Sequence, residues 1–176
     1  GPEKVRGVSY ESTSVTITLH WNNVSDEDIH FYRIEQKGED GTYTKLADQY
    51  NKLGHNIYDL TPGTEYTYRV VGYDQRGNRG TPSDDIVAST QRDSTAPVIT
   101  QIRPNAGYYA DEIPLVITAE DEYQIRSITI QVSRDLMNWV NVKVQNYAGD
   151  GKTQVLRYEL NTSNYEEGAI YVRAVA

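Results

Sequence analysis

Calcium binding is the chemistry that the acidic residues of this sequence could support. Calcium takes carboxylate oxygens as ligands, and three aspartates could supply them: Asp74, Asp93 and Asp121. They are spread around residues 92–97, a short polar segment that ends in proline, and could meet there if the segment joins two modules. No Asp-x-Asp-x-Asp-Gly loop is present, and acidic runs such as residues 26–28 are usual in solvated turns. The alternatives are therefore a calcium site at a module junction and ordinary acidic turns.

Residues for nucleophilic or acid–base catalysis are not grouped in this sequence. It contains no cysteine and three histidines, His20, His30 and His55. A catalytic serine needs a base beside it, and no Gly-x-Ser-x-Gly turn occurs. A zinc site would require histidines from separate predicted strands to converge. We predict that the chain is not an enzyme and has no catalytic or cofactor-binding residues.

Two loops contain residues that are found in recognition sites. Arg76, Gly77 and Asn78 differ from the integrin motif Arg-Gly-Asp by the loss of the carboxylate that would reach the receptor's metal. Glycine and asparagine at these positions are explained by a tight turn alone. Tyr108 and Tyr109 could stack on sugars, although tyrosine is also common on strand surfaces.

The elements that position these residues are predicted to be β-strands. Val15, Ile17 and Leu19 alternate with polar residues, which gives each strand one buried and one exposed face. The same alternation directs Arg33 and Glu35 away from the core. Seven such runs in about 90 residues match the size of one immunoglobulin-like sandwich. The predicted strands are residues 4–10, 15–21, 30–37, 42–47, 55–59, 64–74 and 84–90.

A second series of alternating runs follows residues 92–97. Ile128, Ile130 and Val132 belong to one of these runs, and we count six strands, one fewer than a complete sandwich. The predicted fold class is all-β, with two tandem immunoglobulin-like β-sandwiches, the second lacking its last strand. The expected division is a first domain at residues 1–91, a linker at 92–97 and a second domain at 98–176.

Composition and charge exclude several classes of partner. The 176 residues carry a net charge of −8, and no apolar run is long enough to cross a membrane. Residues 1–92 hold 10 basic and 14 acidic residues, and residues 93–176 hold 7 and 11, so that each half is at −4. Without a basic stripe, neither nucleic acid nor an anionic membrane is an expected partner. The lack of cysteine fits a bacterial exported protein at least as well as a cytosolic one.

Residues 1–91 resemble the fibronectin type III family over nearly their whole length. Residues 60–66, LTPGTEY, match its Leu-x-Pro-Gly-Thr-x-Tyr signature. The resemblance implies a tyrosine corner, in which the Tyr66 ring packs on the core and its hydroxyl meets a backbone group upstream. Leu60 would fill the core beneath. The other matching features are Trp21, residues 32–35 (YRIE), and residues 68–70 leading into 74–78.

The second series resembles the immunoglobulin-like repeats of bacterial surface and secreted proteins. Its opening at residues 94–99, STAPVI, is typical of them, as are residues 128–135, ITIQVSRD, and the closing residues 168–176, GAIYVRAVA. In such repeats an Asp-x-x-Gly-Asn loop and a final strand usually follow, and here they do not. Either the final strand follows beyond residue 176, or it comes from elsewhere. An unpaired sheet edge invites strand addition, so in the second case a strand-addition dimer is expected.

The expected function is structural: non-catalytic spacer or interaction modules of a larger bacterial exported or cell-surface protein. The alternatives are an adhesin segment that binds a protein or glycan through its loops, and accessory modules of a secreted carbohydrate-active enzyme or large toxin. The partners would be other domains of the same chain or a surface protein or glycan, outside the cell or at its surface. Core residues would then matter most: Trp21, Leu60, Tyr66, Ile130 and Val172.

Overall fold

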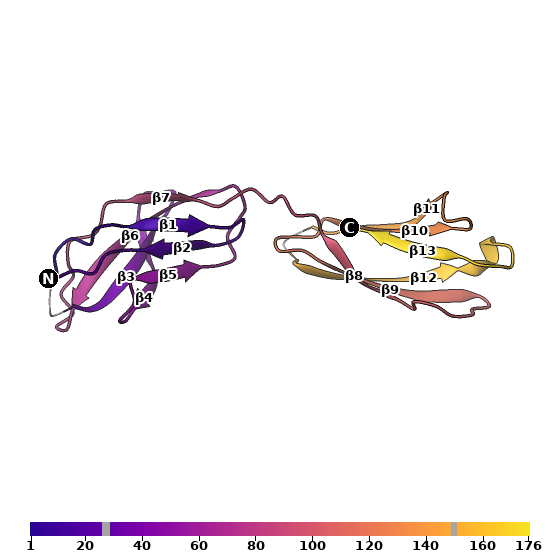
Figure 1. Cartoon of the computed structure of the whole chain (residues 1–176), viewed down its shortest axis with the longest axis horizontal. Helices are drawn as coiled ribbons and strands as arrows, with labels where there is room; N and C mark the ends of the chain where they lie inside the picture. Colours follow the sequence, from indigo (N-terminus) through magenta and orange to yellow (C-terminus); the bar gives the residue numbers. More distant parts are fainter. Residues whose placement is uncertain (26–28, 149–150) are drawn as a thin grey trace. The chain divides into compact units, whose positions relative to one another are not determined.

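Alternating apolar residues form strands throughout the chain (Figure 1). The computed structural model describes residues 1–25, 29–148 and 151–176. The regular elements in these ranges are strands, except for one three-residue 3-10 helix, η1 (Thr162–Asn164). The described residues contain no helix that could span a membrane. The chain divides into two compact units, Gly1–Asp93 and Ser94–Ala176. The all-β fold class is confirmed.

The first unit has seven strands in two antiparallel sheets. One sheet has the order β1-β2-β5 and the other the order β4-β3-β6-β7. Six of the seven strands begin and end within two residues of their expected bounds. The strands are β1 (Ser9–Ser12), β2 (Ile17–His20), β3 (Ile29–Lys37), β4 (Tyr43–Gln49), β5 (Gly54–Ile57), β6 (Glu65–Asp74) and β7 (Ile86–Ser89).

The core of the first unit lies between these sheets. Ile17 and Leu19 of β2 face Ile34 of β3 and Val70 of β6, and all four are fully buried. Trp21, directly after β2, is buried as expected, with its ring 5.7 Å from that of Tyr32. Each large apolar side chain buried in this way contributes about 1.5–3 kcal/mol to stability.

The first strand begins later than the expected residues 4–10. Gly7 has a φ of +67°, a conformation that only glycine adopts without strain, and a Cβ there would meet the side chain of Asn22. The strand cannot run through this position, so the regular pairing starts at Ser9. Val5 still reaches the core from outside any strand, while the Asn22 amide donates to the Arg6 carbonyl oxygen at 2.9 Å.

The predicted tyrosine corner is present between β5 and β6. The Thr61 backbone amide donates to the Tyr66 hydroxyl at 3.0 Å, and the Tyr66 ring packs against the core. Leu60 is partly buried beneath it. Gly63 takes the left-handed conformation, with a φ of +61°, that closes the turn before β6. The local signature therefore fixes how the chain enters β6.

The second unit repeats this arrangement with the six strands counted from the sequence. Its sheets have the orders β8-β9-β12 and β11-β10-β13, which correspond to β1-β2-β5 and β4-β3-β6 of the first unit. The two-sandwich architecture is thus confirmed. The strands are β8 (Val98–Arg103), β9 (Glu112–Glu120), β10 (Ser127–Ser133), β11 (Val140–Asn146), β12 (Thr153–Asn161) and β13 (Tyr171–Val175).

A separate core closes the second unit. Leu115 and Ile117 of β9 pack with Ile130 of β10 and Leu156 of β12. Pro114 lies in β9 without disrupting the sheet, because it precedes the stretch that β8 pairs with, which starts at Val116. Each unit therefore has its own hydrophobic centre.

We expect Tyr66→Phe to lower the free energy of unfolding of the first unit by about 1 kcal/mol, because the Thr61 amide loses its acceptor. Urea denaturation of the variant and the parent measures this difference. Tyr50→Phe, at an exposed tyrosine of the same unit, is the control. Equal stability of Tyr66→Phe and the parent would contradict a stabilising corner.

Candidate functional site

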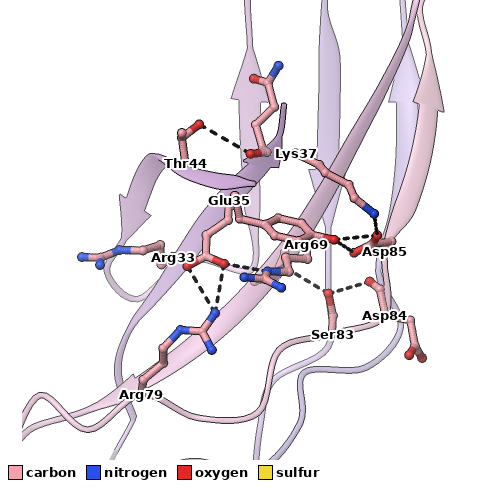
Figure 2. Close-up of polar contacts among 12 residues, drawn as sticks. Arg33, Glu35, Lys37, Thr44, Arg69, Arg79, Ser83, Asp84 and Asp85 are labelled. Carbon is pink, nitrogen blue, oxygen red and sulfur yellow. Dashed lines mark hydrogen bonds and ion pairs between the residues drawn. The ribbon is translucent and has the colours of Figure 1, made fainter. Parts of the chain in front are cut away.

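The outer face of the sheet β4-β3-β6-β7 gathers most of the charged contacts of the first unit. Residues on this face alternate with those that enter the core, so charges from neighbouring strands lie side by side. Figure 2 shows Arg69 and Arg79 reaching Glu35, and Lys37 reaching Asp85. The ion-paired side chains of the face are Arg33, Glu35, Lys37, Lys45, Asp48, Arg69, Arg79 and Asp85.

Glu35 lies at the centre of this face and is nearly inaccessible, with 8% of its surface exposed. Arg69 donates to its Oε2 at 2.6 Å, and Arg79 approaches the same oxygen at 3.0 Å (Figure 2). The Arg69 guanidinium also lies 3.3 Å from the centre of the Tyr43 ring. Removing a carboxylate from water costs free energy unless the charge is paired. The guanidinium groups of Arg69 and Arg79 provide this pairing for Glu35.

Asp85 joins Tyr43 and Lys37 at the edge of the face through hydrogen bonds. It accepts hydrogen bonds from the Tyr43 hydroxyl, at 2.6 Å to Oδ2, and from Lys37 at 3.1 Å. The Tyr43 bond, and then Lys37, hold the pKa of Asp85 below its usual value. The pKa of Lys37 is raised in turn, mainly by its hydrogen bond to Asp85. Both groups therefore stay charged near neutral pH.

An aromatic cluster adjoins the charges at the other end of β3. Phe31 and Tyr73 stack with ring centres 4.8 Å apart, and Arg33 lies 4.7 Å from the Tyr73 ring centre. Arg33 makes two bonds to Asp48, from Nε to Oδ1 at 2.7 Å and from Nη2 to Oδ2 at 3.0 Å. Tyr50 packs on Phe31 and is more than half exposed. This end offers ring faces and a fixed guanidinium plane.

The face is more basic than the unit that carries it. Five of its ion-paired side chains are basic and three are acidic, whereas residues 1–92 as a whole hold 10 basic and 14 acidic residues. An excess of basic groups on a surface suits contact with acidic groups.

Glu35 lies on the outer face, as the alternation of residues predicts, but its burial did not follow from the sequence. Its partners Arg69 and Arg79 are 34 and 44 residues away in the chain, so only the strand register brings them together. The alternating charges Arg33, Glu35 and Lys37 on one strand were the available signal.

Two of the three aspartates proposed for calcium, Asp74 and Asp121, accept hydrogen bonds from the backbone of their own loops. Asp74 accepts from the backbone amides of Arg76 and Asn78 at 2.9 and 2.8 Å, and Asp121 accepts from those of Tyr123 and Gln124 at 2.7 and 2.8 Å. Asp74 and Asp93 belong to the first unit and Asp121 to the second.

The calcium site itself stays a prediction. Within the described ranges, no three His, Asp or Glu side chains form a group suited to a metal ion. The acidic run at residues 26–28 lies outside those ranges. The hydrogen bonds from Asn78, first through its side chain and then its backbone, lower the pKa of Asp74.

A tight turn accounts for Arg76, Gly77 and Asn78. Gly77 has a φ of +81°, its amide donates to the Asp74 carbonyl oxygen at 3.0 Å, and the Asn78 side chain donates to the Asp74 carboxylate. The second unit repeats this device at Asp135, which accepts from the amides of Met137 and Asn138. Both loops are thus closed by an aspartate at their start.

The histidines lie on three strands of the first unit. His20 and His30 are exposed, and His55 is half-buried with Nδ1 at 2.8 Å from the Gln49 amide nitrogen. Burial lowers the pKa of His55, so its imidazole is neutral near neutral pH.

One of the two predicted loop tyrosines, Tyr109, borders a hollow in the second unit. Tyr108 is fully exposed, while Tyr109 lines an open hollow of about 630 Å³ between β8 and β9. Gly107 leaves space for the Tyr109 ring, which a Cβ there would meet at 2.5 Å. The lining residues are Ile102, Arg103, Pro104, Asn105, Tyr109 and Pro114.

Two sheets of three and four strands with a tyrosine corner define the first unit as an immunoglobulin-like sandwich of the fibronectin kind. The model of the family "Fibronectin type III domain" matches residues 2–89, half of the 176 residues. The chain belongs to the fibronectin type III family.

Several animal proteins are similar to about half of the chain. The mouse receptor-type tyrosine-protein phosphatase F is 33% identical over 97 residues, which are 53% of this chain and 5% of the phosphatase. The chicken receptor-type tyrosine-protein phosphatase S is 30% identical over 88 residues, 49% of this chain and 6% of the phosphatase. The chain thus spans only a small part of these relatives.

Solved structures include similar domains. The FN5 domain of Drosophila Lar is 26% identical, with 52% of this chain and 98% of that domain covered and a TM-score of 0.42. The sixth fibronectin type III domain of human fibronectin type III domain containing protein 3 is 22% identical, with 61% and 94% covered and a TM-score of 0.47.

We expect Glu35→Gln to destabilise the first unit by about 2 kcal/mol, because two guanidinium groups lose their counter-charge at a buried position. Urea denaturation is the suitable measurement, since urea does not screen charges. Asp84→Asn is the matched control: its ion pair with Lys4 spans 2.7 Å, but the Asp84 side chain is 89% exposed, so a much smaller change is expected. Equal losses in the two variants would contradict the central role of Glu35.

Acid should destabilise the first unit partly through Asp48. The hydrogen bonds from Arg33 lower the pKa of Asp48 in the folded state. As the pH falls, the unfolded chain therefore binds a proton first, and stability is lost from about pH 4 downward, the usual aspartate range. Asp48→Asn should flatten this loss in urea midpoints recorded between neutral and acidic pH. Glu39→Gln, at an exposed carboxylate, is the control, and an equally steep loss in Asp48→Asn would contradict the assignment.

Proposed function

We propose that this chain is a non-catalytic segment that spaces other parts of a larger exported or cell-surface protein and offers them, or a partner, a binding surface. The observation that carries the proposal is the presence of two sandwiches in tandem, each with its own core. A unit that buries its apolar residues independently keeps its dimensions when its neighbours change.

The use of the polar groups supports a structural role. The carboxylates with short contacts are committed to ion pairs or turns: Glu35 to two arginines, Asp74 and Asp121 to backbone amides. Fibronectin type III domains are non-catalytic modules in general, and this chain is proposed to act in the same way.

The similar proteins support a location outside the cell or at its surface. The relatives are named receptor-type phosphatases, and we infer that this chain also belongs to an exposed protein. A bacterial source is proposed from the second unit alone, in which residues 94–99 and 128–135 resemble repeats of bacterial surface proteins.

The outer face around Glu35 is the surface proposed for a partner. It combines an excess of basic groups with the exposed ring of Tyr50 and the stacked pair of Phe31 and Tyr73. Arginine and tyrosine are enriched in protein interfaces, and a basic area attracts acidic groups. An acidic segment of the same protein or of a neighbour fits this face.

Replacement of the whole segment in the parent protein tests the proposal. We expect deletion of both units to impair the parent's function, and two unrelated fibronectin type III domains of the same length to restore it. Restoration would follow because a spacer depends on length and stiffness and not on its surface. The readout is the parent's activity or surface display.

Failure of the unrelated pair would contradict a purely spacing role. Restoration by a pair that carries only the grafted outer face would then indicate partner binding there. Restoration by a pair that carries the loop with Tyr108 and Tyr109 would favour the adhesin alternative.

A further inference from the structure

The hollow beside Tyr109 lies where β8 ends and β9 begins. Its lining is apolar or aromatic apart from Arg103 and Asn105. Ile102 and Leu115 pack into the core, so Arg103 and Pro114 beside them face outward from the sheet β8-β9-β12. A volume of about 630 Å³ is within the usual range of small-ligand sites. An apolar wall and a cation therefore meet at one open site.

Tyr109 forms one wall of the hollow and is held in place from behind. A Cβ at Gly107 would meet the Tyr109 ring at 2.5 Å, so the ring packs directly against the backbone of this glycine. At the end of the loop, the Thr162 hydroxyl lies 3.1 and 2.8 Å from the carbonyl oxygens of Ala110 and Asp111. The ring still has 40% of its surface exposed. A ring fixed in this way loses little conformational entropy when a ligand packs on it.

Two arginines lie in one row on the outer face of the same sheet. Val116 of β9 is paired with Arg103 of β8 on one side and with Arg157 of β12 on the other. Its neighbours Leu115 and Ile117 are buried, so Val116 and both arginines point outward. Two strand spacings, about 10 Å, separate the arginines. Within the part of the chain that the structure describes, neither forms an ion pair, so both charges lack a counter-charge there.

Groups that bind hydroxyls lie next to this row. Asn105 lines the hollow, and Glu159 of β12 is opposite Pro114. Glu159 faces outward because Leu160 beside it is buried. An amide donates and accepts hydrogen bonds, and a carboxylate accepts them. A ligand that has hydroxyl groups as well as carboxylates therefore suits this surface better than an acidic peptide, whose carboxylates Glu159 would repel.

We propose that the hollow beside Tyr109, together with Arg103 and Arg157, binds an oligosaccharide of uronic acids. The two guanidinium groups pair with carboxylates of successive sugars, each through the paired hydrogen bonds that arginine forms with a carboxylate. The negative face of the Tyr109 ring packs on the partly positive C–H groups of a sugar ring. Asn105 and Glu159 bind the hydroxyl groups. This binding is separate from the spacing role, which depends on the two cores and not on this surface.

An NMR titration of the intact, isotope-labelled chain with trigalacturonic acid tests the site. We expect the amide signals of residues 103–109 and 114–116 to shift until they saturate, and maltotriose, which has no carboxylates, to leave them in place. An absence of shifts with trigalacturonic acid would overturn the proposal. Equal shifts with maltotriose, or with hexaglutamate, would also overturn it, because the sugar or the charge alone would then be sufficient.

Variants of the arginines test whether both charges take part. Arg103→Gln and Arg157→Gln should each raise the dissociation constant for trigalacturonic acid by about tenfold, because one carboxylate loses its cation. Arg126→Gln is the control, since it removes the same charge at an exposed arginine that follows the opposite end of β9. It should have no effect. Equal weakening by Arg126→Gln would mean that only the net charge matters and would rule out this site.

Variants of the two loop tyrosines test the contact with the sugar ring. Tyr109→Ala should weaken binding by about tenfold, whereas Tyr109→Phe keeps the ring and should bind nearly as well as the parent. Tyr108→Ala, at the fully exposed neighbour, is the control and should have no effect. Circular dichroism verifies that each variant is folded. Unchanged binding by a folded Tyr109→Ala variant would contradict the proposal.

Discussion

Burial of alternate side chains between two sheets is the constraint on which both units depend. Ile17 and Leu19 fill the first core from one sheet and Ile34 and Val70 from the other, and a similar set closes the second. Where alternate residues of a strand point into the core, the residues between them must face outward. The chemistry available to the protein is therefore restricted to sheet faces, edges and loops.

The outer face of β4-β3-β6-β7 shows how charges are accommodated under this constraint. Glu35 is nearly inaccessible to water, so its charge depends for compensation on Arg69 and Arg79, which come from β6 and from the loop after it. Tyr43 then packs over Arg69 and anchors Asp85. The result is a rigid basic and aromatic area on an acidic domain, produced by the packing itself.

Local patterns allowed the fold to be predicted from the sequence, while contacts that depend on register did not follow from it. The corner of Tyr66 was predictable because the turn, the glycine and the tyrosine lie within seven residues. The burial of Glu35 was not, since its partners lie on another strand and a distant loop. The start of β1 was misplaced because alternation alone does not reveal that Gly7 takes a positive φ. A carboxylate such as Asp74 suits both a metal and a backbone cap, and the sequence could not separate the two.

The aspartate-closed turns have a consequence for how these domains can change over time. Asp74 and Asp135 each fix their loop through amides two to four residues away, so the loop shape depends on a few neighbouring atoms and hardly on the rest of the sandwich. The side chains at the tips of these loops therefore contribute little to folding. Arg76 and the largely exposed Met137 are examples. Mutation can explore new side chains at such tips at little cost to the scaffold, which makes them the places where a new specificity would evolve first.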